Sequence, residues 1–253
     1  MKQGDFTDLV DDYLKYRPSY NKALVEIIID HVGKKPKLIN AADVGAGTGI
    51  FTKCFIDAGV NSVTAIEPNE KMREAGIKFL GEQVQFLDGS AEETGLLSDS
   101  VDLVSMASSF HWAETDRAIK EFDRILSPNG VFTALWNPRL TERSPVESEV
   151  AALLTGKYKL ISRVSSGLSG VTLKLQDFLQ NCGVFKTVEY IDAVDVVRRS
   201  KREYIGAWRS VNDVQAQLGR AKFEKFIEDI ERVVSTHSYV EVHYLSRAWF
   251  AKK

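Results

Sequence analysis

Cysteine, proline and long apolar runs are all scarce in this chain. Its 253 residues include two cysteines, Cys54 and Cys182, which form no CxxC pair; this argues against a disulfide scaffold or a zinc ribbon. Six prolines and 17 glycines are too few for a collagen-like or low-complexity chain. No apolar run reaches the roughly 18 residues of a membrane-spanning helix. What remains is a globular chain, long enough for one α/β domain with insertions or two small domains.

The first residues and the cysteine content bear on location. The start, MKQGDFTDLVDD, is acidic and lacks a hydrophobic signal core. Sparse cysteine fits a reducing compartment. We therefore expect a cytoplasmic protein with no membrane contact.

The charges are unevenly distributed along the chain. Residues 1–156 carry 16 Lys and Arg against 24 Asp and Glu, a balance of −8, whereas residues 157–253 carry 17 against 11, a balance of +6. The acidic first part argues against nucleic acid as a partner. The basic second part favours an acidic small molecule. The cluster Arg198–Arg202 is basic, but most such runs are solvated faces and it receives no role.

Apolar residues recur with helical and strand-like spacing in alternation up to residue 136. Helical spacing covers residues 20–32, 50–58, 69–80 and 116–126. Strand-like runs cover or end residues 37–44, 62–66, 83–87, 101–107 and 131–136. This alternation predicts an α/β fold in which a parallel sheet has helices on both faces.

Single residues mark the expected ends of these elements. Ser19 and Thr115 are predicted helix N-caps, and Gly33 and Gly59 are predicted helix ends. Residues 127–130 predict a turn. Beyond residue 136 the pattern loosens, and it predicts helical segments near 174–182, 204–211 and 223–234 and strands at 184–191 and 239–250.

A glycine-rich turn, Asp43–Gly49 (DVGAGTG), separates a predicted strand from a predicted helix. Glycine lets the backbone approach a ligand closely, and a helix N-terminus offers free N–H groups. The dinucleotide fingerprint GxGxxG is not met, because Ile50 stands at its sixth position. Asp43 would repel a phosphate and favour a cationic group.

Glu67 ends the next predicted strand, 18 residues after Gly49. An acid at that point can accept hydrogen bonds from both ribose hydroxyls. A ribose and a cation without a phosphate describe S-adenosylmethionine.

At these residues the sequence resembles the class I S-adenosylmethionine-dependent methyltransferases. DVGAGTG is similar to the family's first motif, which implies that Asp43, Gly45, Gly47 and Gly49 bind the cofactor. The resemblance implies a Rossmann-like, doubly wound seven-stranded sheet, mostly parallel with an antiparallel last strand and with helices on both faces. The product would be S-adenosylhomocysteine.

Further cofactor contacts follow from the same resemblance. Glu67 corresponds to the ribose acid, Pro68 and Met72 lie near the adenosine, and Ser90 and Ala91 lie in the segment that flanks adenine. By helical spacing alone Met72 is equally a core residue. Many relatives have aspartate where Ser90 stands, which leaves backbone contacts at that position.

Two finer resemblances concern the acceptor. Residues 100–112, with Phe110-His111-Trp112, and residues 121–130 resemble the small-molecule branch called methyltransferase type 11. Residues 13–20 (YLKYRPSY) and the pair His111-Trp112 look most like the trans-aconitate methyltransferase group within it.

Five side chains are candidates for contacts with the acceptor. Tyr13, Tyr20 and Trp112 are expected at the substrate, and Arg17 at the methionine carboxylate or the substrate; each also fits a packing or surface role. His111 follows the fourth predicted strand, at the sheet edge where open α/β folds bind ligands. It can take a proton from a nucleophile or hydrogen-bond within its loop.

We expect direct in-line methyl transfer to a small-molecule acceptor that is a carboxylate, hydroxyl or amine. A carboxylate needs no general base, whereas the other two would use His111. The chain has no GxxxxGK[ST] loop and no HExxH motif, and its four histidines are scattered, so neither phosphoryl transfer nor a metal is expected.

Two other classes stay open. One is an NAD-dependent oxidoreductase, and the other is a non-catalytic module that binds S-adenosylmethionine. In each case we expect a single domain over residues 1–253. Residues 1–36 would form an N-terminal cap and helix, 37–136 the cofactor-binding core, and 137–253 the remaining strands with insertions that cover the substrate.

Overall fold

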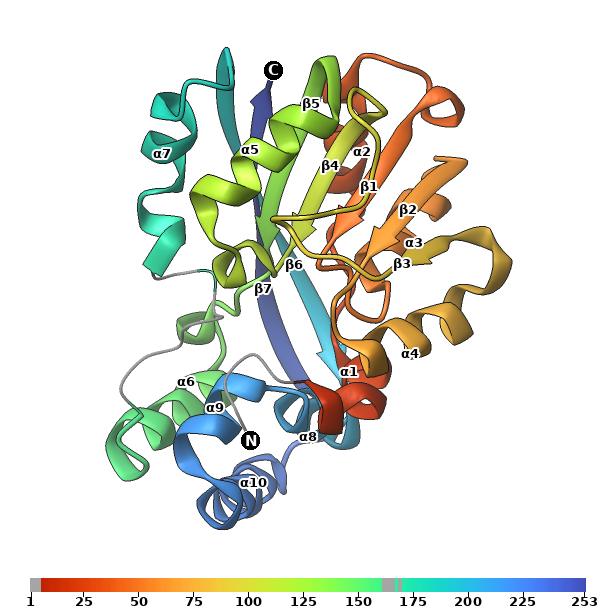
Figure 1. The fold of residues 1–253 in the computed structure, drawn as a ribbon. Helices are drawn as coiled ribbons and strands as arrows, with labels where there is room; N and C mark the ends of the chain where they lie inside the picture. The colour runs from red at the N-terminus through yellow and green to blue at the C-terminus, as the bar shows by residue number, and fades with distance from the viewer. Residues whose placement is uncertain (1–5, 161–166, 168–169) are drawn as a thin grey trace. The chain divides into compact units, whose positions relative to one another are not determined.

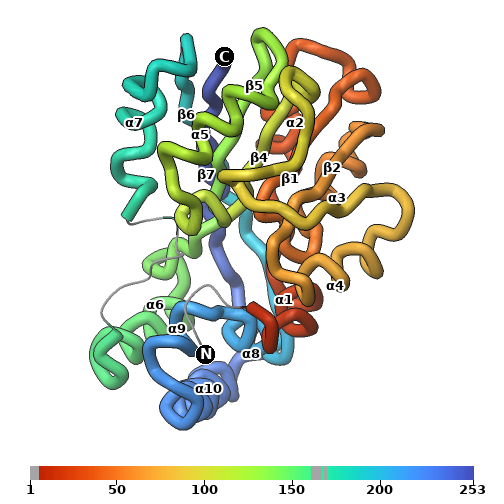
Figure 2. The backbone as a smooth tube through the Cα atoms, in the orientation of Figure 1, coloured from red at the N-terminus to blue at the C-terminus, as the bar shows by residue number. Residues whose placement is uncertain are grey.

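The computed structural model describes residues 6–160, 167 and 170–253. The chain divides into two compact units. The core unit comprises Ser19–Asn137, Gly167–Ala193 and Ser246–Lys253, and the helical unit comprises Met1–Pro18, Pro138–Ser166 and Val194–Leu245. The chain passes between them several times, as its colour lets the reader follow in Figure 2.

A seven-stranded sheet is the centre of the core unit, and residues 194–199 and 240–245 of two of its strands belong to the helical unit (Figure 1). Its order is β3 (Gln85–Leu87), β2 (Ser62–Ile66), β1 (Asn40–Val44), β4 (Val101–Ala107), β5 (Leu126–Trp136), β7 (Val240–Lys252) and β6 (Thr187–Arg199). The pairs β1–β2, β1–β4, β2–β3 and β4–β5 are parallel, and β7 is antiparallel to β5. The predicted sheet with an antiparallel last strand is confirmed. Its strand order reverses between β1 and β4, where open sheets bind ligands.

Helices cover both faces of this sheet. α2 (Lys22–Val32) and α3 (Ile50–Asp57) bury Ile28 and Phe55 against one face. α5 (Thr115–Ile125) and α7 (Leu175–Asn181) bury Phe122 and Leu179 against the other (Figure 1). Successive residues of a strand point to opposite faces of the sheet. Leu103 packs in the cluster that contains Ile28 and Phe55, and Val104 packs in the cluster that contains Phe122 and Leu179. α4 (Glu70–Leu80) completes the unit.

Two predicted helix caps are wrong, and the structure shows why. The side chain of Asn21, not Ser19, accepts a hydrogen bond from the Leu24 N–H at 3.0 Å and caps α2. Thr115 is the first residue of α5, whose N-cap is Glu114. Asparagine side chains compete well for such N–H groups. Gly33 ends α2 in a left-handed conformation, as predicted.

Two strands are longer than the sequence pattern indicates. β5 begins at Leu126, and the predicted turn of residues 127–130 is an irregularity between the pairs Val101–Leu126 and Leu103–Val131. β6 extends over 13 residues. Its exposed and half-buried residues alternate, and that polar alternation obscured the strand beyond residue 191.

The helical unit contains α1 (Val10–Tyr16), α6 (Pro145–Ala152), α8 (Lys201–Arg209), α9 (Asn212–Leu218) and α10 (Arg220–Val234). Its core combines Tyr204 and Trp208 with the predicted apolar face of α10.

Short helical turns occur in both units. They cover Thr7–Leu9, Pro36–Leu38, Gly81–Gln83, Phe110–Trp112, Thr141–Arg143, Leu153–Lys157 and Gly170–Leu173. No helix within the described ranges is both long and apolar enough to cross a membrane.

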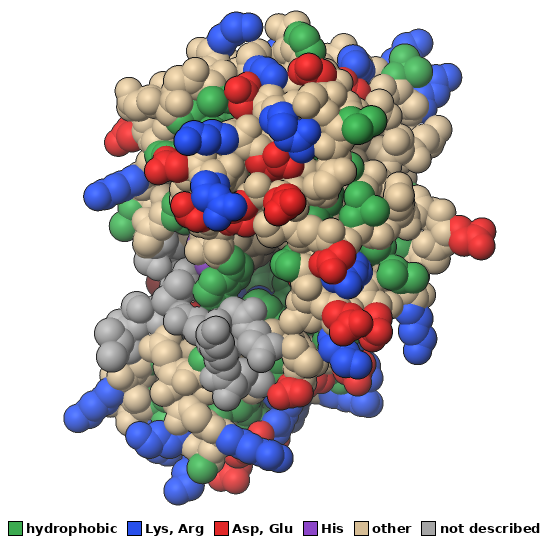
Figure 3. All heavy atoms as spheres, viewed as in Figure 1, with side chains coloured by type: hydrophobic (Ala, Val, Ile, Leu, Met, Phe, Trp, Pro, Cys, Tyr) green, Lys and Arg blue, Asp and Glu red, His purple; other side chains and the backbone are tan. Residues whose placement is uncertain are grey.

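Charged side chains of both signs are interspersed on the face seen in Figure 3. One of the few buried charges is Asp102, near the start of β4. It accepts hydrogen bonds from Lys34 Nζ at 2.6 Å, the Asn40 N–H at 3.0 Å and Ser127 Oγ at 3.0 Å. Burial opposes these bonds, but together they hold the pKa of Asp102 below its ordinary value. Asp102 therefore ties β1 and β5 to β4.

Replacing this carboxylate should weaken the fold. Asp102→Asn is expected to lower the free energy of unfolding at pH 7 by about 1–3 kcal/mol, because it loses charge-assisted hydrogen bonds. The folded pKa is depressed, so the wild-type advantage should be full above about pH 4–5 and shrink as the pH falls further. Urea unfolding at several pH values measures this, with the exposed Asp57→Asn as control. A deficit independent of pH would contradict the assignment.

Candidate functional site

The glycine loop after β1 has the backbone that only glycine adopts without strain. Gly45, Gly47 and Gly49 have φ of +67°, +59° and +81°. A Cβ at Gly45 would lie 2.7 Å from Ser109 Cβ, and one at Gly49 would lie 2.6 Å from Leu80 Cδ1. Packing therefore already requires these two glycines. A Cβ at Gly47 would meet only Met72 Cε, at 3.2 Å, so this position reports most directly on a ligand.

Glu67, directly after β2, holds this loop. Its Oε2 accepts the Gly47 N–H at 2.7 Å, and its Oε1 accepts the Asn69 N–H at 2.8 Å. The side chain keeps 7% of its exposure. Burial raises the pKa of Glu67 against the effect of these bonds. A carboxylate offers about four lone-pair sites, so two remain for further donors.

Asp43, in β1, is fully buried beneath the loop. Thr52 Oγ1 donates to its Oδ2 at 2.6 Å, and Ser105 Oγ donates to its Oδ1 at 2.8 Å. Burial raises the pKa of Asp43 to about 6, in opposition to these two hydrogen bonds. The carboxyl thus joins α3 to β4 beneath the glycine loop. The expected direct contact with a cofactor stays a prediction.

The segment after β3 carries Ser90 and Ala91. The Ser90 N–H donates to the Glu93 carbonyl at 2.9 Å, and Ser90 Oγ accepts the Glu92 N–H at 3.2 Å. Both polar groups of Ser90 thus shape their own loop, whereas Ala91 is buried. Pro68 is exposed beside Glu67.

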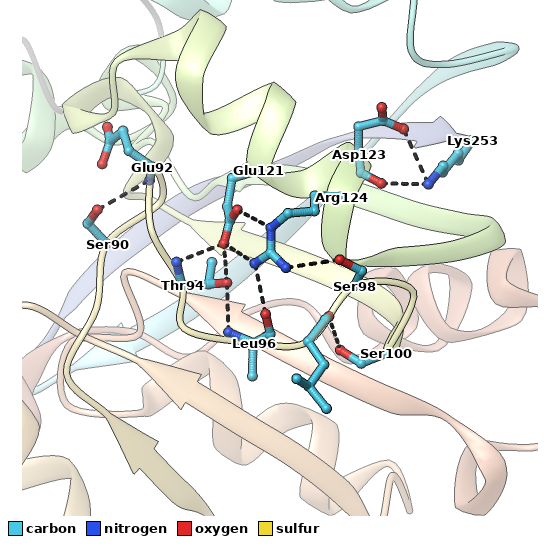
Figure 4. A network of polar contacts seen from close by, with 11 residues as sticks. Ser90, Glu92, Thr94, Leu96, Ser98, Ser100, Glu121, Asp123, Arg124 and Lys253 are labelled. Atoms are coloured by element: carbon cyan, nitrogen blue, oxygen red, sulfur yellow. Dashed lines mark hydrogen bonds and ion pairs between the residues drawn. The ribbon is translucent and has the colours of Figure 1, made fainter.

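Figure 4 shows how this segment is held against α5. Glu121 Oε1 accepts both the N–H of Thr94, at 2.9 Å, and its hydroxyl, at 2.5 Å. Arg124 binds Glu121 and donates to the Leu96 carbonyl at 2.8 Å. The acid and the arginine of the 121–130 stretch therefore position the loop that follows Ser90.

The segment after β4 lies beside the glycine loop, at the reversal of strand order. Ser109 Oγ donates to the Val44 carbonyl at 3.1 Å. Ser108 has φ of +54°, which a residue with a Cβ adopts at a cost. Its Oγ lies 2.9 Å from the Tyr20 hydroxyl. The surrounding contacts thus maintain a strained turn directly before His111.

His111 has a defined hydrogen-bond partner. The Trp136 Nε1–H donates to its Nδ1 at 3.2 Å. An indole nitrogen is only a donor, so Nδ1 serves as acceptor and the proton of a neutral imidazole resides on Nε2. Trp112 is partly exposed and tilted against the His111 ring, with centroids 4.4 Å apart.

Two predicted site residues belong to the helical unit. Arg17 Nη2 donates to the Ser210 carbonyl at 3.0 Å, and its guanidinium lies 4.8 Å from the Tyr13 ring centroid. Arg17 thereby joins the end of α1 to the end of α8. The other predicted residues lie in the core unit, at the carboxyl ends of β1 to β4 or on α4, with Tyr20 before α2.

The sequence reading missed several residues that organise this site. Asn69 caps α4 and donates to Glu67, and Arg73 Nη1 donates to the Glu67 carbonyl at 2.7 Å. Ser105 and Trp136 support Asp43 and His111. Only Asn69 carried a signal, as a capping residue directly before a helix; the others meet their partners through the fold. Among the described residues, no group of three or more His, Cys, Asp or Glu side chains could hold a metal.

Comparison with known proteins finds relatives that match part of this chain. Residues 42–134 match the family model described as a methyltransferase domain. An uncharacterized methyltransferase of Mycobacterium bovis is 34% identical over 134 residues, 53% of this chain and 52% of the relative. A probable S-adenosylmethionine-dependent methyltransferase of Saccharomyces cerevisiae is 30% identical over 131 residues, which cover 49% of this chain and 43% of the relative. The chain spans about half the length of the curated relatives it matches.

Solved structures show the same fold. A candidate type II methyltransferase from Anaeromyxobacter dehalogenans superposes with a TM-score of 0.71 at 20% identity, over 94% of this chain and 98% of that one. A candidate methyltransferase from an antibiotic biosynthesis pathway of Anabaena variabilis superposes with a TM-score of 0.61 at 19% identity, over 92% and 98%. Residues 42–134 of the core unit are thus similar to a methyltransferase domain, and the core unit has a Rossmann-like fold.

The buried Asp43 should leave a signature in the pH dependence of stability. Its folded pKa of about 6 lies above the ordinary value near 3.9, so this group favours folding at low pH. That contribution should fade as the pH rises through 6, by up to roughly 3 kcal/mol between pH 4 and 7. Asp43→Asn should remove this slope from the unfolding free energy measured by urea titration. An unchanged slope would show that Asp43 titrates normally.

Proposed function

We propose that the protein transfers a methyl group from S-adenosylmethionine to a small-molecule acceptor. The observation that carries this proposal is the Glu67 carboxylate beside the glycine loop. It is buried, it is anchored by the Gly47 and Asn69 N–H groups, and it retains two lone-pair sites that suit the two ribose hydroxyls.

The residues present fit this cofactor. Gly45–Gly49 expose backbone, and α3 begins directly after them. Ile50, not a lysine, directly follows the last glycine of this loop. The buried Asp43 makes the surroundings of the loop more negative, which suits a sulfonium and disfavours a pyrophosphate. Met72, 3% exposed, closes the Gly47 side of the loop. Ala91 lies in the segment that would flank the adenine.

Under this proposal, catalysis consists mainly of positioning the cofactor and the acceptor for the transfer. When bound, S-adenosylmethionine supplies an electrophilic methyl group on a good leaving group. Glu67 and the glycine loop hold the nucleoside and methionine parts in register. The turn Ser108–Trp112 borders the place where an acceptor would approach, and the Trp112 ring offers a face that suits a cation.

In this proposal, His111 donates a hydrogen bond to the acceptor. Trp136 engages the Nδ1 lone pair, so a neutral His111 offers Nε2–H and has no second lone pair with which to accept a proton. An acceptor that is already ionised at neutral pH suits this arrangement. A carboxylate acceptor, as the resemblance to the trans-aconitate methyltransferase group implies, is the class we propose.

The alternative functions differ in what they predict. An NAD-dependent oxidoreductase would bind NADH, and a non-catalytic module would bind S-adenosylmethionine without forming S-adenosylhomocysteine. Thermal shift with both cofactors and detection of the product separate the three functions.

The cytoplasmic location and the single-domain organisation remain proposals that rest on the sequence.

Cofactor affinity should depend on Glu67. Glu67→Ala removes the ribose acceptor and should weaken S-adenosylhomocysteine binding by about 1–3 kcal/mol, measured by calorimetry. The exposed Glu70→Ala should bind normally. Because Glu67 also holds the loop, the melting temperature of each variant is needed as a folding control. A folded Glu67→Ala with wild-type affinity would remove Glu67 from the site.

The role of His111 can be read from the pH dependence of the rate. If His111 is a donor, His111→Ala should chiefly raise the Michaelis constant for a carboxylate acceptor, with a small change in kcat. Trp136→Phe frees Nδ1 and should shift the tautomer of His111, which nitrogen-15 NMR detects. A loss of kcat by roughly 10²–10⁴-fold in His111→Ala, with activity in wild type that falls as the histidine protonates, would instead assign a general base.

A further inference from the structure

Glu92, in the loop after β3, binds a segment that lies far from it in the sequence. Its Oε1 accepts the Glu114 N–H at 2.6 Å. Glu114 is the N-cap residue of α5 and follows the turn that carries Trp112. The Glu92 carboxylate therefore joins the loop of Ser90 and Ala91, on the proposed cofactor side, to the turn on the proposed acceptor side.

The Glu92 side chain is fixed within its own loop and is charged. The Glu92 N–H donates to Ser90 Oγ at 3.2 Å (Figure 4). Burial raises the pKa of Glu92, but hydrogen bonds from the Glu114 N–H and the Ser90 side chain outweigh it and hold that pKa below its ordinary value. The carboxylate is thus ionised at neutral pH, and an ionised acceptor makes a stronger hydrogen bond with an N–H group than a neutral one does.

The helix α5 holds the same loop a second time, in the opposite direction. Glu121 of α5 accepts the N–H and the hydroxyl of Thr94, as Figure 4 shows. The loop thus supplies an acid, Glu92, to the start of the helix, and the helix supplies an acid to the loop. Because these contacts lie two residues apart in the loop, we expect the loop and the start of α5 to move together.

The turn that carries Trp112 leads directly into α5 through a row of backbone hydrogen bonds. The Trp112 N–H donates to the Ser109 carbonyl at 2.9 Å, and the N–H of the next residue donates to the Phe110 carbonyl at 3.2 Å. The N–H that follows is that of Glu114, and its acceptor is the Glu92 carboxylate. A displacement of the loop would therefore be transmitted to the turn through this bond.

We infer that Glu92 is a positioning residue that couples cofactor binding to the placement of the turn that carries Trp112. The inference rests on the proposed function, because it requires that the adenine part of S-adenosylmethionine binds against Ser90 and Ala91. Coupling between two sites is reciprocal. An acceptor should therefore bind more tightly to the complex of the protein with its cofactor than to the free protein.

The test follows the indole N–H resonance of Trp112 by NMR, after Trp112→Phe has identified it. In wild type, S-adenosylhomocysteine should shift this resonance. Glu92→Ala should lose most of the shift, whereas its affinity for S-adenosylhomocysteine, measured by calorimetry, should stay within about threefold of wild type because no hydrogen bond to the ligand is removed. Glu92→Gln should restore the shift, since its amide oxygen can still accept the Glu114 N–H.

The neighbouring Glu93, which is exposed, supplies the matched control. Glu93→Ala removes the same charge and should keep the full shift of the Trp112 resonance. The inference would be overturned by a wild-type shift in Glu92→Ala, by an equal loss in Glu93→Ala, or by the absence of a shift in a wild-type protein that binds S-adenosylhomocysteine. A wild-type protein that does not bind S-adenosylhomocysteine would instead overturn the proposed function, and this inference with it.

Discussion

The Glu67 carboxylate joins the ends of two neighbouring strands, and the geometry of the site depends on that link. One oxygen receives the N–H of Gly47 and the other that of Asn69. The Ile66 carbonyl adds two hydrogen bonds from Gly45 and Ala46, at 2.8 and 3.1 Å. The glycine loop is thus bound to the end of β2 before any ligand arrives. Such preorganisation lowers the entropic cost of binding.

Beneath this link the sheet buries the Asp43 carboxylate, whose charge is unfavourable there. Asp43 is buried, and its raised pKa of about 6 means that the folded state is less stable at neutral pH than it would be with a neutral side chain. The strained Ser108 adds a second local cost. Both lie next to the reversal of strand order, where a parallel sheet opens to ligands. Local costs concentrated at one edge are typical of a functional site, which agrees with the proposed cofactor site.

Sequence reasoning succeeded where one strong local pattern governs the structure. The strands at 62–66 and 101–107 have the predicted bounds; the second is buried on both faces over almost its whole length. The glycine loop and Glu67 were recognisable from their spacing. The cap of α2 was missed because asparagine and serine are both good caps, and only the path of the chain decides between them. The cap of α5 was missed because Glu114, its N-cap, makes no side-chain capping hydrogen bond that a sequence pattern could predict. The helices α1, α6 and α9, each of eight residues or fewer, were not individually predicted. The partners of Asp43 and His111 lie on distant strands, and no local pattern announces them.

The proposed methyl transfer requires that the protein forms S-adenosylhomocysteine. The direct measurement incubates the protein with S-adenosylmethionine and a small-molecule metabolite pool, and quantifies the product by mass spectrometry. Formation of S-adenosylhomocysteine is expected to require the pool and to be lost in Gly47→Val, whose side chain would occupy the space beside the loop. A wild-type protein that binds NADH and forms no S-adenosylhomocysteine with any fraction of the pool would contradict it.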